Sequence, residues 1–89
     1  MIHHKNEGEN LRIKIKELVF DFMKSTPDCS ANAQGLKQAE IFRECGLDWG
    51  EYPNATSTNQ QYWIVALLRE LESEEKVKRD PVTKRWTIT

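Results

Sequence analysis

Hydrophobic residues recur at helical spacing in three stretches of the chain and alternate with polar residues near its C-terminal end. One helical face of the first stretch carries five apolar residues: Leu11, Ile15, Leu18, Val19 and Phe22. Its other faces carry the basic residues Arg12, Lys16 and Lys24. Asn10 is a suitable N-cap, and Pro27 disfavours helical backbone in the residue before it. The pattern predicts a helix that starts near Asn10 and stops at Ser25.

The chain before the first helix is a polar segment, and the chain after it begins with a connector that leads to a second helix. Residues 1–8 are polar and include Gly8, so we expect a disordered tail before a single domain at residues 9–89. The connector at residues 30–34 leaves room for one short strand. A second helix is predicted over about residues 37–45, because four apolar residues can face inward there: Leu36, Ile41, Phe42 and Cys45. Gly46 is expected to close that helix in a left-handed conformation.

The third helix has the clearest pattern. Ser57 or Thr58 forms a capping box with Gln60 or Gln61, which predicts the start of the helix. Its expected buried stripe consists of Ile64, Leu67, Leu68 and Leu71. The opposite face then presents Asn59, Tyr62, Ala66, Arg69 and Ser73. These outward residues are the candidates for contact with a partner.

The C-terminal residues predict a short antiparallel hairpin. Val77 begins the first strand, and a turn follows at Asp80, Pro81, Val82 and Thr83. On the returning strand Trp86 and Ile88 alternate inward. Three residues are expected to face solvent: Lys78, Arg85 and Thr87. The expected fold class is therefore α+β, mainly α, with three packed helices and a small C-terminal hairpin.

Charge is distributed unevenly, although the 89 residues carry a net charge of only -1. The segment from Lys76 to Thr89 contains one acidic residue, Asp80, and five basic ones: Lys76, Lys78, Arg79, Lys84 and Arg85. Four acidic residues precede it: Glu70, Glu72, Glu74 and Glu75. The basic end would attract phosphate and the acidic run would repel it, so nucleic acid could approach only in one orientation.

The sequence contains no pattern typical of catalysis. It lacks a glycine-rich phosphate loop, paired histidines at metal spacing and a nucleophile with a nearby base. Cys29 and Cys45 fit neither a disulfide framework nor a zinc site. We therefore expect no enzyme activity, cofactor or metal. No apolar stretch has the length of a membrane span, and a soluble, cytoplasmic protein is expected.

Several segments together resemble the winged-helix superfamily over about residues 10–89: the first helix, GLKQAEIFRECGL, LLRELESEEKVKRD and RWTIT. GLKQAEIFRECGL is similar to the first helix of a helix-turn-helix, with Ala39 at the helix crossing and Gly46 at the turn. Glu75 stands where the family commonly has glycine. The long loop LDWGEYPNATST before the third helix is, more distantly, similar to N-terminal winged-helix domains of modification-dependent restriction enzymes.

The resemblance implies a DNA-binding domain, such as a transcriptional regulator or an accessory DNA-binding factor. The third helix would enter the major groove through Thr58, Asn59, Gln60, Tyr62 and Arg69. The hairpin, or wing, would contact phosphates through Lys78, Arg79, Lys84 and Arg85. Few phosphate contacts are available to one copy, which favours a homodimer or a protein partner on double-stranded DNA. The alternative is a protein-interaction module that docks partners on Tyr62, Trp63 and the aromatic loop.

Overall fold

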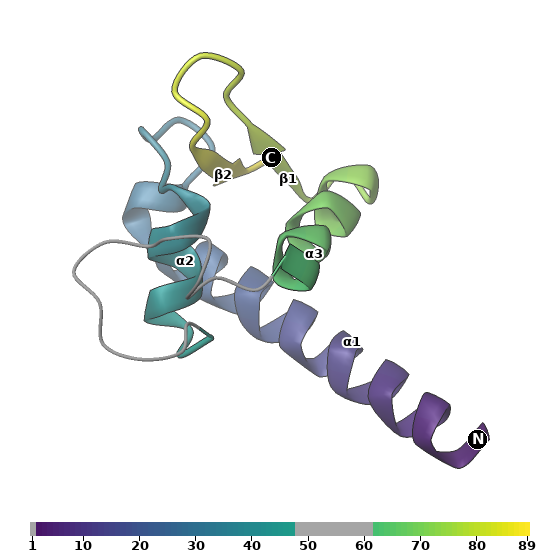
Figure 1. Cartoon of the computed structure of the whole chain (residues 1–89). Coiled ribbons are helices and arrows are strands. Elements are labelled where there is room, and N and C mark those ends of the chain that lie inside the picture. Colours follow the sequence, from purple (N-terminus) through teal and green to yellow (C-terminus); the bar gives the residue numbers. More distant parts are fainter. Residues whose placement is uncertain (1, 48–61) are drawn as a thin grey trace.

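The described residues form an α+β fold of three main helices and one two-stranded antiparallel sheet (Figure 1). The computed structural model describes the backbone of residues 2–47 and 62–89, and the side chains of residues 3–47 and 65–89. Along the chain lie α1 (Ile2–Ser25), a short 3-10 helix η1 (Pro27–Cys29), α2 (Gln38–Glu44), α3 (Tyr62–Ser73), β1 (Val77–Arg79) and β2 (Trp86–Ile88). This coarse fold class is the one that the sequence predicts.

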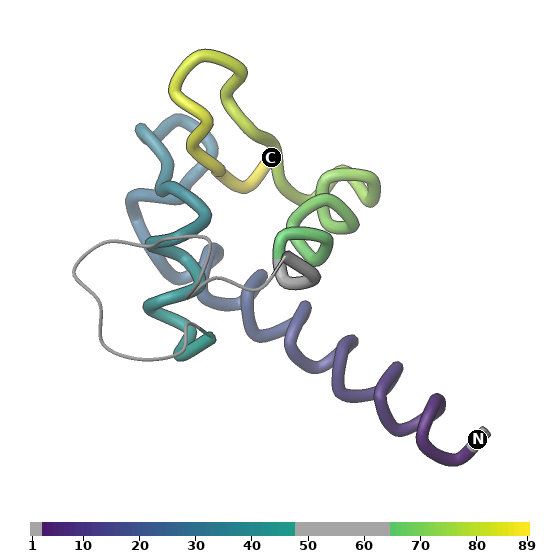
Figure 2. Tube along the Cα trace, viewed as in Figure 1, coloured from purple at the N-terminus to yellow at the C-terminus, as the bar shows by residue number. Residues whose placement is uncertain are grey.

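Helix α1 is the longest element and supports the other two helices. Both α2 and α3 contact it, and the hairpin lies between α2 and α3, with β2 also in contact with α1 (Figures 1 and 2). The N-terminal half of α1 projects beyond the body of the molecule, and residues 3–10 are all exposed. The prediction of a disordered tail at residues 1–8 is corrected here, because the helix already begins at Ile2. These residues pack against no core, so their sequence carries no amphipathic signal.

The core-facing side of α1 differs from the predicted stripe. Val19 and Met23 are fully buried, whereas Leu11 and Leu18 are 57% and 46% exposed. The cause lies at the C-terminal end of α3, where Glu70 pairs with Arg12 of α1 and the following Glu74 pairs with Lys16. Basic residues that were expected to point elsewhere therefore flank the interface between α1 and α3.

The ends of α2 and α3 share one type of C-terminal cap, the Schellman motif. At α2 the Leu47 amide donates to the Phe42 carbonyl (2.8 Å), and Gly46 has the expected left-handed φ of 73°. At α3 the Lys76 amide donates to the Leu71 carbonyl (2.9 Å), and the left-handed residue is Glu75, with φ 62°. A glutamate thus adopts the conformation for which glycine is preferred.

The hairpin is joined to the helical body by the chain that precedes α2. Strand register pairs Val77 with Ile88, Lys78 with Thr87 and Arg79 with Trp86. On the other edge of β2, Leu36 forms an antiparallel bridge with Trp86, through hydrogen bonds of 2.8 and 3.2 Å. Residues just before α2 therefore lie beside β2 as a third, minimal strand.

This bridge explains one wrong prediction, because Thr87 is only 7% exposed rather than facing solvent. Gly35 lies against it with φ 84°, and a Cβ at Gly35 would come within 2.8 Å of the Trp86 carbonyl oxygen. Only a residue without a side chain fits this position. The covering chain is distant in sequence from Thr87, so the local alternation of β2 could not reveal it.

One hydrophobic core draws residues from all of these elements: Val19, Met23, Cys29, Ile41, Phe42, Leu67, Leu68, Leu71, Val77 and Trp86. The predicted inward positions Ile41, Phe42, Leu67, Leu68 and Leu71 are confirmed. Ser57 and Thr58, the expected start of the third helix, lie outside the described residues, as does the side chain of Ile64.

Candidate nucleic-acid interface

The turn between β1 and β2 is held by the side chain of Asp80. Its carboxylate accepts hydrogen bonds from the amides of Val82 (2.7 Å) and Thr83 (2.9 Å), and these two bonds, Thr83 first, lower the pKa of Asp80. The Lys84 amide donates to the Asp80 carbonyl (2.8 Å), with Lys84 at a left-handed φ of 64°. The predicted turn is confirmed, and the hairpin has a defined shape.

Trp86 brings together a cation from α3 and a cation from β1. The guanidinium carbon of Arg69 lies 5.4 Å from the centre of the Trp86 ring, and that of Arg79 lies 5.9 Å from it. Both distances are within the range of cation–π attraction. Arg69 also pairs with Glu72 at 3.1 Å. Two residues predicted to contact DNA from separate elements therefore meet at one buried tryptophan.

Arg85 is tied to the helical body. Its Nη1 donates to the Gly35 carbonyl at 3.1 Å and lies 4.0 Å from a carboxylate oxygen of Glu40. The same Glu40 oxygen accepts the amide hydrogen bond of Lys37 at the start of α2 (3.0 Å). Arg85 thus connects the hairpin to α2, and its side chain is only 28% exposed. These contacts give the Arg85 side chain a structural role.

The four basic residues of the hairpin, Lys78, Arg79, Lys84 and Arg85, are called the hairpin cations below. Among the residues that the structure describes, Lys78 and Lys84 are exposed and form no ion pair. Lys78, Arg79 and Arg85 line a surface hollow of about 350 Å³ beside residues 31–34. The hairpin therefore holds two anchored arginines and two lysines whose charge is available to a ligand.

A second hollow, of about 430 Å³, separates the hairpin from the start of α2. Arg79 and Lys84 line it from the hairpin, and Lys37 lines it from α2. Reasoning from sequence missed Lys37 as a member of the basic surface. The Leu36–Trp86 bridge carries Lys37 to the hairpin, and no local pattern predicts such a long-range pairing.

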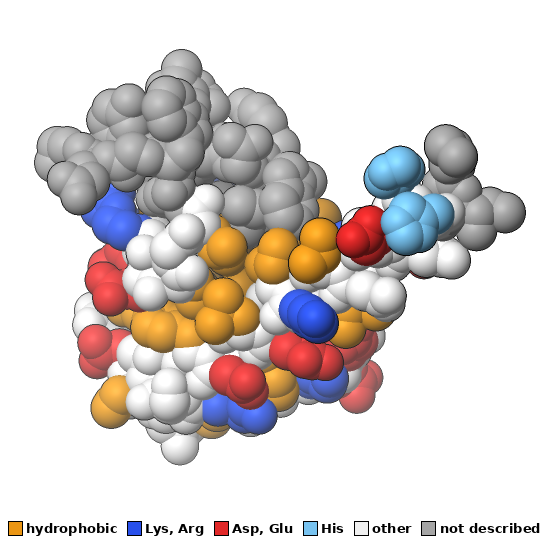
Figure 3. Space-filling view, turned by 90° about the horizontal axis from the view of Figure 1, so that it is seen from below, with side chains coloured by type: hydrophobic (Ala, Val, Ile, Leu, Met, Phe, Trp, Pro, Cys, Tyr) orange, Lys and Arg blue, Asp and Glu red, His pale blue; other side chains and the backbone are white. Residues whose placement is uncertain are grey.

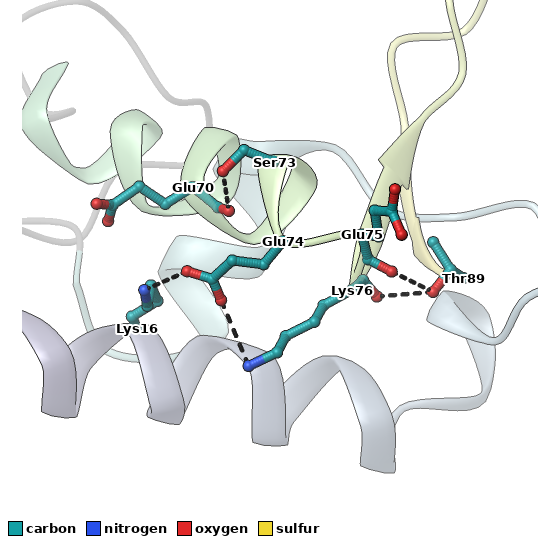
Figure 4. A network of polar contacts seen from close by, with 7 residues as sticks. All are labelled: Lys16, Glu70, Ser73, Glu74, Glu75, Lys76 and Thr89. Atoms are coloured by element: carbon teal, nitrogen blue, oxygen red, sulfur yellow. Dashed lines mark hydrogen bonds and ion pairs between the residues drawn. The ribbon is translucent and has the colours of Figure 1, made fainter.

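The acidic run at the C-terminal end of α3 is largely neutralised by cations. Glu70 pairs with Arg12. Glu74 lies 2.7 Å from Lys16 and 3.4 Å from Lys76 (Figure 4). The hydrogen bond from Lys16 is the main cause that lowers the pKa of Glu74. The expected repulsion of phosphate by this run is therefore reduced, because three of its four carboxylates, those of Glu70, Glu72 and Glu74, already have cationic partners.

The predicted contacts at the start of the third helix cannot be placed. Thr58, Asn59 and Gln60 lie outside the described residues, and Tyr62 and Trp63 are described only in their backbone. Of the helix candidates, Arg69 is the one with a described side chain, and it is exposed on α3 as predicted.

The described part of the chain contains no group of three or more His, Cys, Asp or Glu side chains that could hold a metal ion. None of its helices is long and apolar enough to cross a membrane. Comparison with protein-family models, curated proteins and solved structures found no match.

Proposed function

We propose that this chain is a winged-helix domain that binds double-stranded DNA, as a transcriptional regulator or an accessory DNA-binding factor. The wing is the hairpin of β1 and β2, and the recognition helix is α3. The observation that carries the proposal is the meeting of Arg69 from α3 and Arg79 from β1 at Trp86. A recognition helix and a wing must present their cations close together, and these two arginines lie beside the same tryptophan ring.

The order of elements also supports the winged-helix assignment. Three helices precede the hairpin, and the chain between the first two bridges to β2 at Leu36 and Trp86. This bridge holds the hairpin against α2 and α3, so that its position relative to the helices is defined. A hairpin that moved freely could not keep a fixed register on a duplex.

The charges favour phosphate as the partner of the hairpin. Lys78 and Lys84 are exposed and unpaired among the described residues, and Lys37 adds a third lysine beside Lys84. Lysine binds phosphate as a point charge and does not require the planar geometry of arginine. The two lysines would supply backbone contacts, and base contacts would come from α3.

Titration of the isotope-labelled chain with a short mixed-sequence duplex, followed by amide chemical shifts, tests this proposal. We expect shifts on the hairpin and on α3, with Lys78, Lys84 and Arg69 among the affected residues, that diminish as salt is added. Amides in the projecting half of α1, such as Lys5, should not move. An absence of shifts at low salt, or shifts confined to α1, would contradict the proposal.

A further inference from the structure

Helix α1 carries a second apolar stripe that the described residues bury only in part, because Ile15 and Phe22 pack at the edge of the core while Leu11 and Leu18 are exposed. Leu11, Ile15, Leu18 and Phe22 are spaced four, three and four residues apart, which is the spacing of a coiled-coil seam. We call these four residues the α1 seam. It spans about 17 Å of helix. Val19 and Met23, which face the core, occupy other positions around the same helix.

The seam lies at the surface. Leu11 and Leu18 are 57% and 46% exposed, and Ile15 and Phe22 are half-buried. Hydrophobic side chains gather on the face of the molecule seen from below, along α1 (Figure 3). Burial of a leucine side chain is worth roughly 2 kcal/mol, so water contact along the whole seam is unfavourable. Contiguous exposed apolar residues of this kind mark interaction sites.

We infer that the α1 seam binds the α1 seam of a second copy of this chain, with the two helices antiparallel about a twofold axis. In such a pair Leu11 lies opposite Phe22 of the second copy, and Ile15 lies opposite Leu18. Every seam residue thereby meets another seam residue. A twofold interface is self-complementary, so each of these two contacts occurs twice.

Charge complementarity supports this antiparallel register. Lys14 and Asp21 are exposed and precede Ile15 and Phe22, so both lie on the same flank of the seam. In antiparallel pairs, residues on equivalent flanks face each other across the interface. This register brings Lys14 of one copy to Asp21 of the other, and the symmetry repeats the pair. A parallel pair would bring the Lys14 flank to the opposite flank of the second copy, which carries Arg12 and Val19, and Lys14 would then have no acidic partner there.

The projecting half of α1 agrees with the same partner. Residues 3–10 are exposed on all sides, and a free helical segment of this length is marginal in water. In the antiparallel register the two helices overlap from Gly8 to Ser25, over about 26 Å. Residues beyond that overlap extend along the body of the second copy. The inference does not depend on DNA binding, since the seam is separate from the hairpin cations.

Sedimentation velocity of the full chain without DNA tests the inference. We expect the apparent mass of the wild type to increase with concentration toward twice the 10.4 kDa mass of one chain. Leu18→Glu should sediment as a monomer, with an unchanged helical circular dichroism spectrum because Leu18 is surface-exposed. Ile13→Glu is the matched control: Ile13 is 47% exposed on the same helix but off the seam, and this variant should remain a dimer.

A charge exchange tests the register itself. Lys14→Asp and Asp21→Lys should each weaken self-association, because each places like charges across the interface. A mixture of the two variants should recover association, since both cross-pairs then become attractive. A wild type that stays monomeric throughout the concentration series overturns the inference. A Leu18→Glu dimer, or a mixture that associates no better than its components, does so as well.

Discussion

Among the residues that the structure describes, two that are not glycine, Glu75 and Lys84, have left-handed backbone conformations, with φ values of 62° and 64°. This conformation costs roughly 1 kcal/mol or more for a residue with a Cβ. Glu75 closes α3, and Lys84 ends the hairpin turn. The two positions are alike in backbone but differ in charge. Substitutions at these two positions can therefore distinguish an effect on stability from an effect on ligand binding.

We expect Glu75→Gly and Lys84→Gly each to raise the free energy of unfolding by roughly 1 kcal/mol, because glycine adopts positive φ without steric strain. Only Lys84→Gly should weaken binding to duplex DNA, since it removes a phosphate-binding charge. Chemical denaturation and fluorescence anisotropy measure the two effects. Equal losses of DNA affinity in both variants would show that the lysine charge is not the cause.

The buried thiol of Cys29 should cause a loss of stability at alkaline pH. Burial, followed by the nearby charge of Asp28, raises the pKa of the Cys29 thiol from 9.0 to about 11. A raised pKa means that the folded protein retains the proton longer than the unfolded chain. The stabilising contribution of the neutral thiol is therefore complete below pH 9 and declines between pH 9 and about 11.

Thermal unfolding of the wild type and of Cys29→Ala measures this contribution. The variant should be less stable at neutral pH, because it leaves a cavity in the core. Its melting temperature should decrease less steeply than that of the wild type between pH 9 and 11. Parallel curves over this range would show that the thiol does not titrate differently in the folded state.

At the scale of elements, the central connection is the one between the hairpin and the chain before α2. Gly35 makes this connection possible, because its carbonyl accepts the Arg85 hydrogen bond and its amide donates to the Asp28 carbonyl at 2.8 Å. Trp86 packs in the core beside it. A change at Gly35 should thus affect the hairpin, although Gly35 lies 50 residues from Arg85 in sequence.

Gly35→Ala should lower the free energy of unfolding by about 2 kcal/mol or more, because it adds both left-handed strain and a contact of 2.8 Å with the Trp86 carbonyl. Gly46→Ala is the control: it also has positive φ, but its Cβ would meet no atom within 4 Å. Urea denaturation should rank the wild type first, Gly46→Ala second and Gly35→Ala last. A reversed order of the two variants would contradict the packing of Gly35.

Sequence patterns predicted the elements whose burial is decided locally. The stripe of Leu67, Leu68 and Leu71 and the turn at Asp80 follow from spacing and turn chemistry. On α1, apolar residues occupy two stripes, and periodicity cannot decide which stripe faces the core. The position of α3 decides it, and this position depends on contacts distant in sequence.

For the candidate site, the sequence predicted which basic residues are present but not the contacts that each of them makes. The concentration of basic residues on the hairpin is visible in the sequence, but their division into anchored and available charges is not. Arg85 depends on Gly35, and Arg79 depends on Trp86 through its position across the strand pair. Arg85 and Gly35 become neighbours only when the hairpin packs against the body, and Arg79 and Trp86 only when the two strands pair. The same holds for Lys16 and Glu74, which are 58 residues apart.

At the scale of the whole molecule, we propose two separate surfaces, one for DNA binding and one for self-association. The hairpin and α3 present cations, and the α1 seam presents apolar residues away from them. A dimer through the seam would double the number of phosphate contacts, which a single copy with net charge -1 supplies sparingly. The two proposals reinforce each other but are tested separately. DNA binding is the central one.

The most direct measurement of DNA binding is the salt dependence of duplex affinity for the wild type and for the double variant Lys78→Ala with Lys84→Ala. We expect the wild type to bind at low salt, and we expect the double variant to reduce the magnitude of the slope of log affinity against log salt by about 1.8. Lys5→Ala with Lys24→Ala removes the same charge elsewhere and should leave the slope unchanged. Equal slopes for the wild type and the hairpin variant, or no binding by the wild type at low salt, would contradict DNA binding through the hairpin lysines.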